Sequence, residues 1–78
     1  MTEQQLKMAK VLDEVELPRG GRLVLLDMRT VGVVNVFPQF AVYEQRDMYY
    51  FVAGSNDKSD AWRAFQTATE KKRKQERR

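Results

Sequence analysis

Residues 40–53 read FAVYEQRDMYYFVA. Two runs rich in aromatic and β-branched side chains flank the polar segment 44–47, a pattern typical of two β-strands joined by a tight turn. We therefore predict strands over 40–44 and 48–53 that pair in antiparallel fashion. Connections this short favour an antiparallel arrangement, because a parallel crossover needs about a dozen residues or more.

The same strand-like texture extends upstream to Arg22 and predicts further strands over 22–28 and 31–37. Pro38 cannot donate a hydrogen bond to a sheet, so 31–37 and 40–44 are either two strands or one strand bent at an edge or bulge. Gly20 and Gly21 are expected to form a turn before the first strand. The sequence thus predicts a small antiparallel sheet of three to four strands.

The N-terminal segment has the pattern of an amphipathic helix. Thr2 and Gln5 have the spacing of a capping box. Apolar residues then recur with helical spacing at Met8, Val11, Leu12 and Val15. We predict a helix over 3–16, ended by Pro18 and the glycines.

The C-terminal segment predicts a second helix. Asp57 is a good N-cap, and Asp60 lies near the positive helix end. The apolar face of this helix consists of Ala61, Trp62, Phe65, Ala68 and Thr69. The predicted fold is a single α+β domain over 1–78, with the order α-β-β-β(-β)-α. Whether the two helices cover the same sheet face or opposite faces stays open.

The positive charge is concentrated at the C-terminus. Residues 1–60 hold seven basic and nine acidic groups, a net charge of −2, whereas 61–78 hold seven basic and two acidic groups, a net charge of +5. The net charge of the whole chain is +3. Residues 70–78 have no apolar side chain and are expected to extend the helix beyond the core. A cationic run of this kind attracts phosphate or acidic protein surface over about one Debye length.

These cations form the predicted nucleic-acid-binding site. Its residues are Arg63, Lys71, Lys72, Arg73, Lys74, Arg77 and Arg78. Neutralising phosphates with such groups releases counterions whatever the base sequence. The alternative is a solvated helix end whose cations suit the negative end of the helix dipole.

The aromatic residues are candidates for a protein interface, with Tyr43, Tyr49 and Tyr50 as its predicted members. Strand alternation places Tyr49 and Phe51 on one sheet face and Tyr50 on the other. If both helices cover one face, the other leaves aromatic surface open to a partner. Otherwise the tyrosines extend the core.

Trp62, the single tryptophan, is either an interface anchor or packs its helix onto the sheet.

Composition argues against catalysis and against membrane insertion. The chain has no cysteine and no histidine, so the commonest metal ligands and the usual proton shuttle are missing. Ser55 and Ser59 are the only serines, and neither has a base in a recognisable motif. The uninterrupted apolar runs, such as Leu23–Leu26, are far shorter than the ~18 residues that span a bilayer. We expect no enzyme activity, metal, cofactor or small-molecule substrate, and a cytoplasmic location.

Two hypotheses of function follow. In the first, the chain is a non-enzymatic binding module whose basic C-terminal helix contacts nucleic acid or an acidic partner. In the second, it is a small protein-binding inhibitor or adaptor, of the type that phages and mobile elements encode, which acts through its aromatic sheet face or an edge strand. A homodimer is compatible with either hypothesis.

Overall fold

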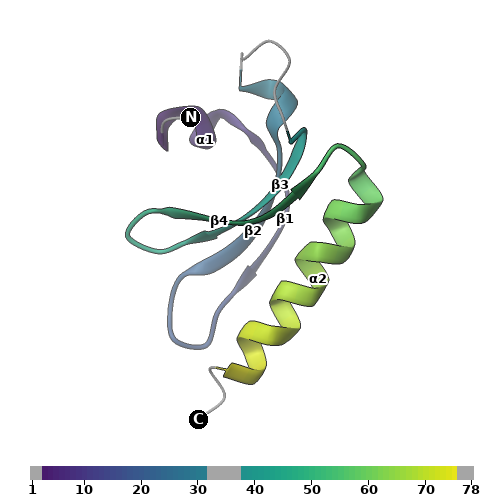
Figure 1. The fold of residues 1–78 in the computed structure, drawn as a ribbon. Coiled ribbons are helices and arrows are strands. Elements are labelled where there is room, and N and C mark those ends of the chain that lie inside the picture. The colour runs from purple at the N-terminus through teal and green to yellow at the C-terminus, as the bar shows by residue number, and fades with distance from the viewer. Residues whose placement is uncertain (1–2, 32–37, 76–78) are drawn as a thin grey trace.

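The computed structural model, which describes residues 3–31 and 38–75, is an α+β fold with a four-stranded sheet (Figure 1). The strands are β1 (Lys10–Glu16), β2 (Arg22–Asp27), β3 (Phe40–Gln45) and β4 (Tyr49–Ser55). Each strand pairs antiparallel with the next along the chain, in the order β1-β2-β3-β4. A short helix α1 (Glu3–Met8) precedes the sheet, a turn of 3₁₀ helix η1 (Met28–Thr30) follows β2, and α2 (Lys58–Gln75) ends the described chain. The predicted fold class is confirmed.

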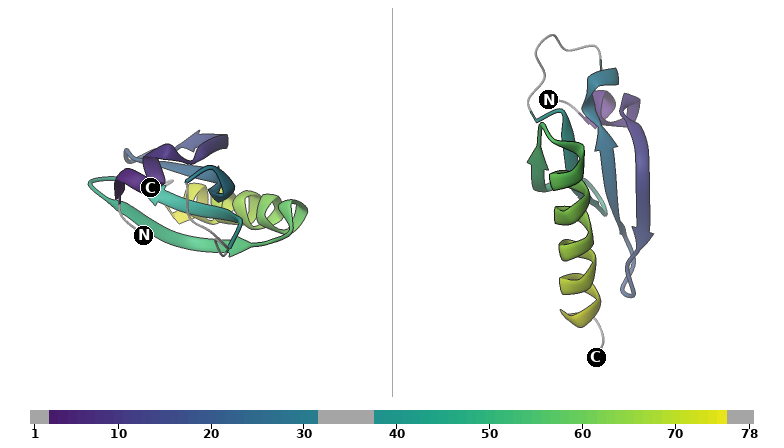
Figure 2. Two further views of the ribbon diagram at one scale, coloured as in Figure 1. Left: turned by 90° about the horizontal axis from the view of Figure 1, so that it is seen from above. Right: turned by 90° about the vertical axis from the view of Figure 1, so that its right-hand side faces the viewer.

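Helix α2 covers one face of the sheet, where it runs along the strands (Figure 2). Leu23 and Leu25 of β2 and Val42 of β3 point toward this helix and are almost completely buried. Ala61 and Phe65 of α2 pack onto them. Side chains along β2 and β3 alternate between the two sheet faces, so every second one points to α2. The apolar run in β2 is uninterrupted because both of its faces are covered.

The opposite face has its own, smaller core. Val24, Leu26 and Ala41 point away from α2 and pack against Leu6 of α1. Tyr43 and Tyr49 are half-buried at the margin of this cluster. The two helices therefore lie on opposite faces, which settles the arrangement that the sequence left open. Since α1 has only six residues, it covers only part of its face.

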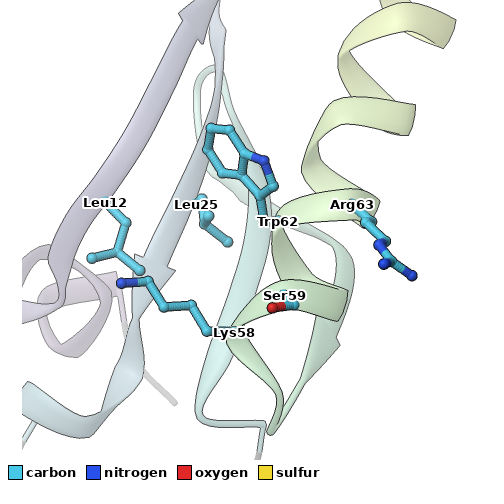
Figure 3. A pocket seen from close by; sticks show the side chains of 6 residues that line it. All are labelled: Leu12, Leu25, Lys58, Ser59, Trp62 and Arg63. Atoms are coloured by element: carbon cyan, nitrogen blue, oxygen red, sulfur yellow. The ribbon is translucent and has the colours of Figure 1, made fainter.

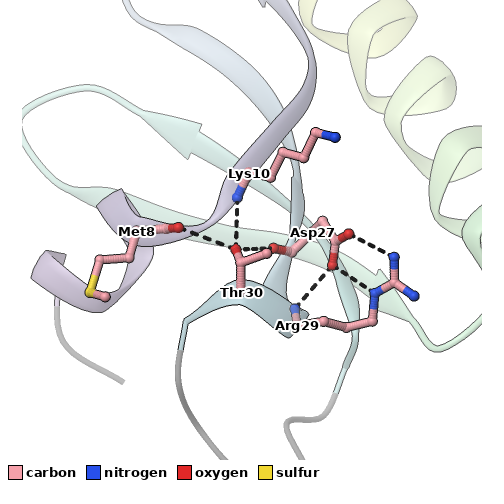
Figure 4. Close-up of polar contacts among 5 residues, drawn as sticks. All are labelled: Met8, Lys10, Asp27, Arg29 and Thr30. Carbon is pink, nitrogen blue, oxygen red and sulfur yellow. Dashed lines mark hydrogen bonds and ion pairs between the residues drawn. The ribbon is translucent and has the colours of Figure 1, made fainter.

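A polar junction fixes α1 to the sheet (Figure 4). The Thr30 hydroxyl accepts a hydrogen bond from the Lys10 backbone N–H at 3.1 Å and lies 3.2 Å from the Met8 carbonyl oxygen. Beside it, the buried Asp27 carboxylate accepts from the Arg29 guanidinium at 2.8 and 3.0 Å. This pairing, with the Arg29 side chain as its main cause, lowers the pKa of Asp27.

The predicted helix over 3–16 is wrong beyond Met8, because residues 10–16 form the edge strand β1. The register of β1 on β2 shifts between Val11 and Asp13. This bulge puts Leu12 and Val15 on the α2 face, where both pack against the core. A bulged strand thus gives apolar residues three positions apart on one face, as a helix does.

The other predicted elements agree with the structure where residues are described. The strands predicted over 22–28, 40–44 and 48–53 correspond to β2, β3 and β4, with ends that differ by one or two residues. The turn at 44–47 joins β3 to β4, closed by a 2.9 Å bond from the Arg46 N–H to the Met48 carbonyl. Of the strand predicted over 31–37, residues 32–37 lie outside the described chain, as does Thr2 of the proposed capping box.

Gly20 and Gly21 form the predicted turn, and here the glycines are required. Their φ angles are +93° and +77°, a region that other residues avoid. The turn joins β1 to β2 and is closed by bonds between Leu17 and both glycines. It brings the edge strand back onto β2.

Candidate nucleic-acid interface

Helix α2 presents the candidate interface. The Asp57 carboxylate accepts a hydrogen bond from the Ser59 N–H at 2.8 Å, so the predicted N-cap is confirmed. The buried residues Ala61, Phe65 and Thr69 mark the stripe that faces the sheet. The side of the helix opposite this stripe is accessible to a partner.

Four cations of the predicted site lie on the accessible surface of α2. They are Arg63, Lys71, Arg73 and Lys74, all exposed. Within residues 3–31 and 38–75, none of the four forms an ion pair. Arg77 and Arg78, the remaining members of the predicted site apart from Lys72, lie outside the described residues.

Lys72 differs from its neighbours because it takes part in the fold. Its ammonium lies 2.8 Å from the carboxylate of Glu44 at the end of β3. Glu44 also accepts from Arg46 on the β3–β4 turn. The Lys72 bond is the main cause, and the Arg46 bond the second, of a lowered pKa for Glu44. Lys72 is therefore not one of the cations that remain unpaired on the surface of the fold.

Four of the five acids on the described strands, all except Glu16, have partners of their own. Glu14 lies 2.5 Å from Arg22, in addition to the pairs formed by Asp27 and Glu44 described above. Asp13 accepts from the backbone N–H of Glu14 at 2.8 Å. These contacts hold the four carboxylates on the sheet, and none of the four pairs with Arg63, Lys71, Arg73 or Lys74.

The structure separates the three tyrosines of the predicted protein interface. Tyr43 and Tyr49 lie on the face of α1, with ring centroids 6.1 Å apart in an edge-to-face contact. Phe51, which the sequence analysis did not include among the site residues, joins them at 5.6 Å from Tyr43 and is 58% exposed. Tyr50 is paired with Glu44, on the α2 face, and donates to Asp47 at 3.0 Å. Burial raises the pKa of Tyr43.

A hollow lies between α2 and the edge strand β1 (Figure 3). Its volume is about 440 Å³, and its floor and wall are formed by Leu12, Leu25 and Trp62. Trp62 stacks on Phe65, with centroids 5.8 Å apart, yet 40% of its surface remains exposed. Trp62 therefore packs on Phe65 but keeps an exposed surface, and its role as an interface anchor stays a prediction.

Lys58 is a functional candidate that the sequence analysis missed. Figure 3 shows its side chain reaching across the mouth of the hollow toward Leu12, while Arg63 points away from it. The hollow was not foreseeable, because the segment that holds Leu12 was assigned to a helix. A cation near an exposed indole is the only signal that the sequence offered.

Other site types lack support in the part of the chain that the structure describes. No group of three or more acidic residues, cysteines or histidines there has the arrangement of a metal site. No helix of that part is sufficiently long and apolar to cross a membrane. No protein-family model matches the chain, and the comparisons with curated proteins and with solved structures found no match.

Proposed function

We propose that this protein is a non-enzymatic module that binds nucleic acid through the outer surface of α2. The observation that carries the proposal is the set of four exposed cations, Arg63, Lys71, Arg73 and Lys74, without ion pairs in the described chain. Cations that contribute nothing to the fold remain free to replace the counterions of a phosphate backbone. Lys72 is expected to contribute less, since contact with phosphate would compete with Glu44.

The experiment is a salt titration of oligonucleotide binding, followed by fluorescence anisotropy of a labelled strand. We expect the logarithm of the affinity to fall linearly with the logarithm of the salt concentration, with a slope of roughly −2 to −4 for about four phosphate contacts. Lys71→Ala, Arg73→Ala and Lys74→Ala should each weaken binding and reduce the slope by about one unit or less.

Lys7→Ala is the matched control. Lys7 is also exposed and forms no ion pair in the described chain, but it lies on α1, at the other face of the sheet. Its loss should leave the slope unchanged. Equal weakening by Lys7→Ala and Lys71→Ala would reduce the effect to net charge alone. No binding at 50 mM salt or below would contradict the proposal.

A second candidate function, binding of a protein partner, is favoured by the cluster of Tyr43, Tyr49 and Phe51. Phe51 is largely exposed although its ring contacts Tyr43, as an anchor for a partner would be. In this version Phe51→Ser abolishes binding to the partner in a pull-down while circular dichroism stays unchanged. Tyr50→Ser, on the other face of the same strand, is the control and should retain binding.

A further inference from the structure

We propose that the hollow beside Trp62 receives an unstacked base of a single-stranded nucleic acid, with the Trp62 indole as the stacking platform. This inference rests on the proposed function and adds the substrate class. It assigns contacts to the base, whereas the cations of α2 contact only phosphates. Both can therefore be tested separately on the same protein.

The hollow exists because α2 is displaced from the edge of the sheet. The helix packs mainly on β2, β3 and β4, which leaves the α2 face of β1 partly uncovered. Leu12 at the bulge and Val15 beyond it are only half-buried there. Trp62 stands in this gap with one hollow on each side, of about 440 and 370 Å³, and lines both.

The indole is held in a fixed orientation but is not covered. Phe65, itself 3% exposed, stacks against Trp62 with an interplanar angle of 27°. A ring held by a buried neighbour loses little side-chain freedom on binding. The apolar side chains of Leu12 and Leu25 offer the edges of a base a dry surface in the first hollow.

The charges around the two hollows favour one orientation of the strand. Lys58 and Arg73 belong to α2, at the first and the second hollow respectively. The β1 side contributes Asp13, whose carboxylate already accepts from the Glu14 N–H. A strand with its phosphates along α2 and a base turned toward β1 satisfies this distribution. The second hollow also has Glu70, whose negative charge disfavours a phosphate there. The more favourable phosphate contact is therefore at Lys58, beside the first hollow.

A double helix does not fit this site, because its bases are stacked on one another and not available to the indole. Stacking on aromatic side chains is the usual recognition of single strands, and it tolerates every base. The combination of a cationic helix and one accessible indole therefore favours single-stranded over double-stranded ligands.

The test uses Trp62 itself as the probe, since it is the only tryptophan of the chain. Oligothymidylate is titrated into the full-length protein while the indole fluorescence and the anisotropy of the labelled strand are recorded. We expect quenching of the indole at the same midpoint as the anisotropy change. A duplex of equal length and poly-glutamate should cause little quenching even where they compete for the helix.

Trp62→Leu keeps an apolar side chain on Phe65 but removes the stacking platform, and should weaken single-strand binding on the order of ten-fold. Trp62→Phe should restore most of the affinity. Phe51→Leu, at another exposed aromatic residue on the far face, is the matched control and should bind like the parent protein. Circular dichroism melts confirm that each variant is folded.

The outcomes separate the two proposals. Salt-dependent binding without quenching, with Trp62→Leu unaffected, overturns the stacking site and leaves the proposed function intact. Equal quenching by duplex and single strand also overturns the choice of substrate class. A Trp62 signal that responds to poly-glutamate and not to oligothymidylate assigns the hollow to an acidic peptide. No binding of any nucleic acid overturns both proposals.

Discussion

At the scale of single residues, Glu44 links helix α2 to the β3–β4 turn. Its carboxylate holds Lys72 of α2 and Arg46 of the β3–β4 turn at once. Through Glu44, a member of the predicted binding site becomes part of the folded structure. Protonation of Glu44 therefore weakens its contact with Lys72 and its contact with Arg46.

The lowered pKa of Glu44 predicts acid sensitivity. Stability from these bonds is fully present above the unfolded-state pKa, near 4.5, and is lost as the pH falls through the lower folded-state value. Glu44→Gln should cost about 1 kcal/mol or less at pH 7 and flatten the pH dependence of the unfolding free energy below about pH 4.5. Urea titrations between pH 7 and pH 3 measure this. An unchanged slope in the variant would contradict the role of Glu44.

Alanine substitutions at the two adjacent glycines of the β1–β2 turn should lower the free energy of unfolding by different amounts. A Cβ atom on Gly21 would lie 2.8 Å from Arg46 Cγ and 2.9 Å from the Gln45 carbonyl oxygen, whereas one on Gly20 would meet nothing within 4 Å. Both alanine variants adopt an unfavourable φ angle, at about 1 kcal/mol each. Gly21→Ala should destabilise the protein by roughly 1 to 3 kcal/mol more than Gly20→Ala, in the same urea assay. Equal values would mean that the Gln45–Arg46 turn relaxes.

At the scale of elements, α1 is held on the sheet by one main side chain. Leu6 is 6% exposed in the second core, whereas Met8 two residues later is 62% exposed. Leu6→Ala should cost about 2 to 4 kcal/mol of unfolding free energy, and Met8→Ala less than about 0.5 kcal/mol. Thermal melts of the pair measure this. A Leu6 cost equal to that of Met8 would show that α1 adds nothing to stability.

Strand β1 shows where the sequence was insufficient. Spacing alone assigned 10–16 to a helix, because the bulge at Leu12 imitates helical periodicity. The β-branched residues Val11 and Val15 favour a strand, but the decisive force is pairing with β2, which no local window contains. By contrast β3 and β4, whose pairing partner is adjacent in sequence, were predicted nearly to the residue.

As with the strands, the part of the candidate site that depends on neighbouring residues in the sequence was predictable, and the part that depends on packing was not. Residues 71–74 are contiguous in sequence, so the exposure of Lys71, Arg73 and Lys74 followed from the end of the apolar stripe. The pairing of Lys72 with Glu44 was not predictable, because it depends on how α2 crosses β3. The hollow at Trp62 depends on the distance of α2 from β1, which only the packed structure determines.

At the scale of the whole molecule, both cores share the same two strands. Leu23 and Leu25 belong to one, and Val24 and Leu26 to the other. Neither core can therefore dissolve without disturbing the other. In a chain of 78 residues, such sharing favours a single cooperative transition.

Cooperative unfolding is testable with intrinsic probes on the two faces. Trp62 fluorescence reports the α2 face, and the near-ultraviolet circular dichroism of Tyr43 and Tyr49, recorded on Trp62→Phe to remove the indole signal, reports mainly the other. We expect coincident urea midpoints for both signals, and an unfolding enthalpy of roughly 55 kcal/mol from the per-residue average. Separate midpoints would show that the α1 face opens first.

The two outer strands differ in how they would receive a strand from another molecule. β1 carries three carboxylates among its seven residues, and the side chain of Asp13 occupies the amide of Glu14. Such an edge resists the addition of further strands and so protects the protein from fibril growth on that side. β4 carries no charge in its seven residues, which makes it the edge at which aggregation would begin in concentrated solution.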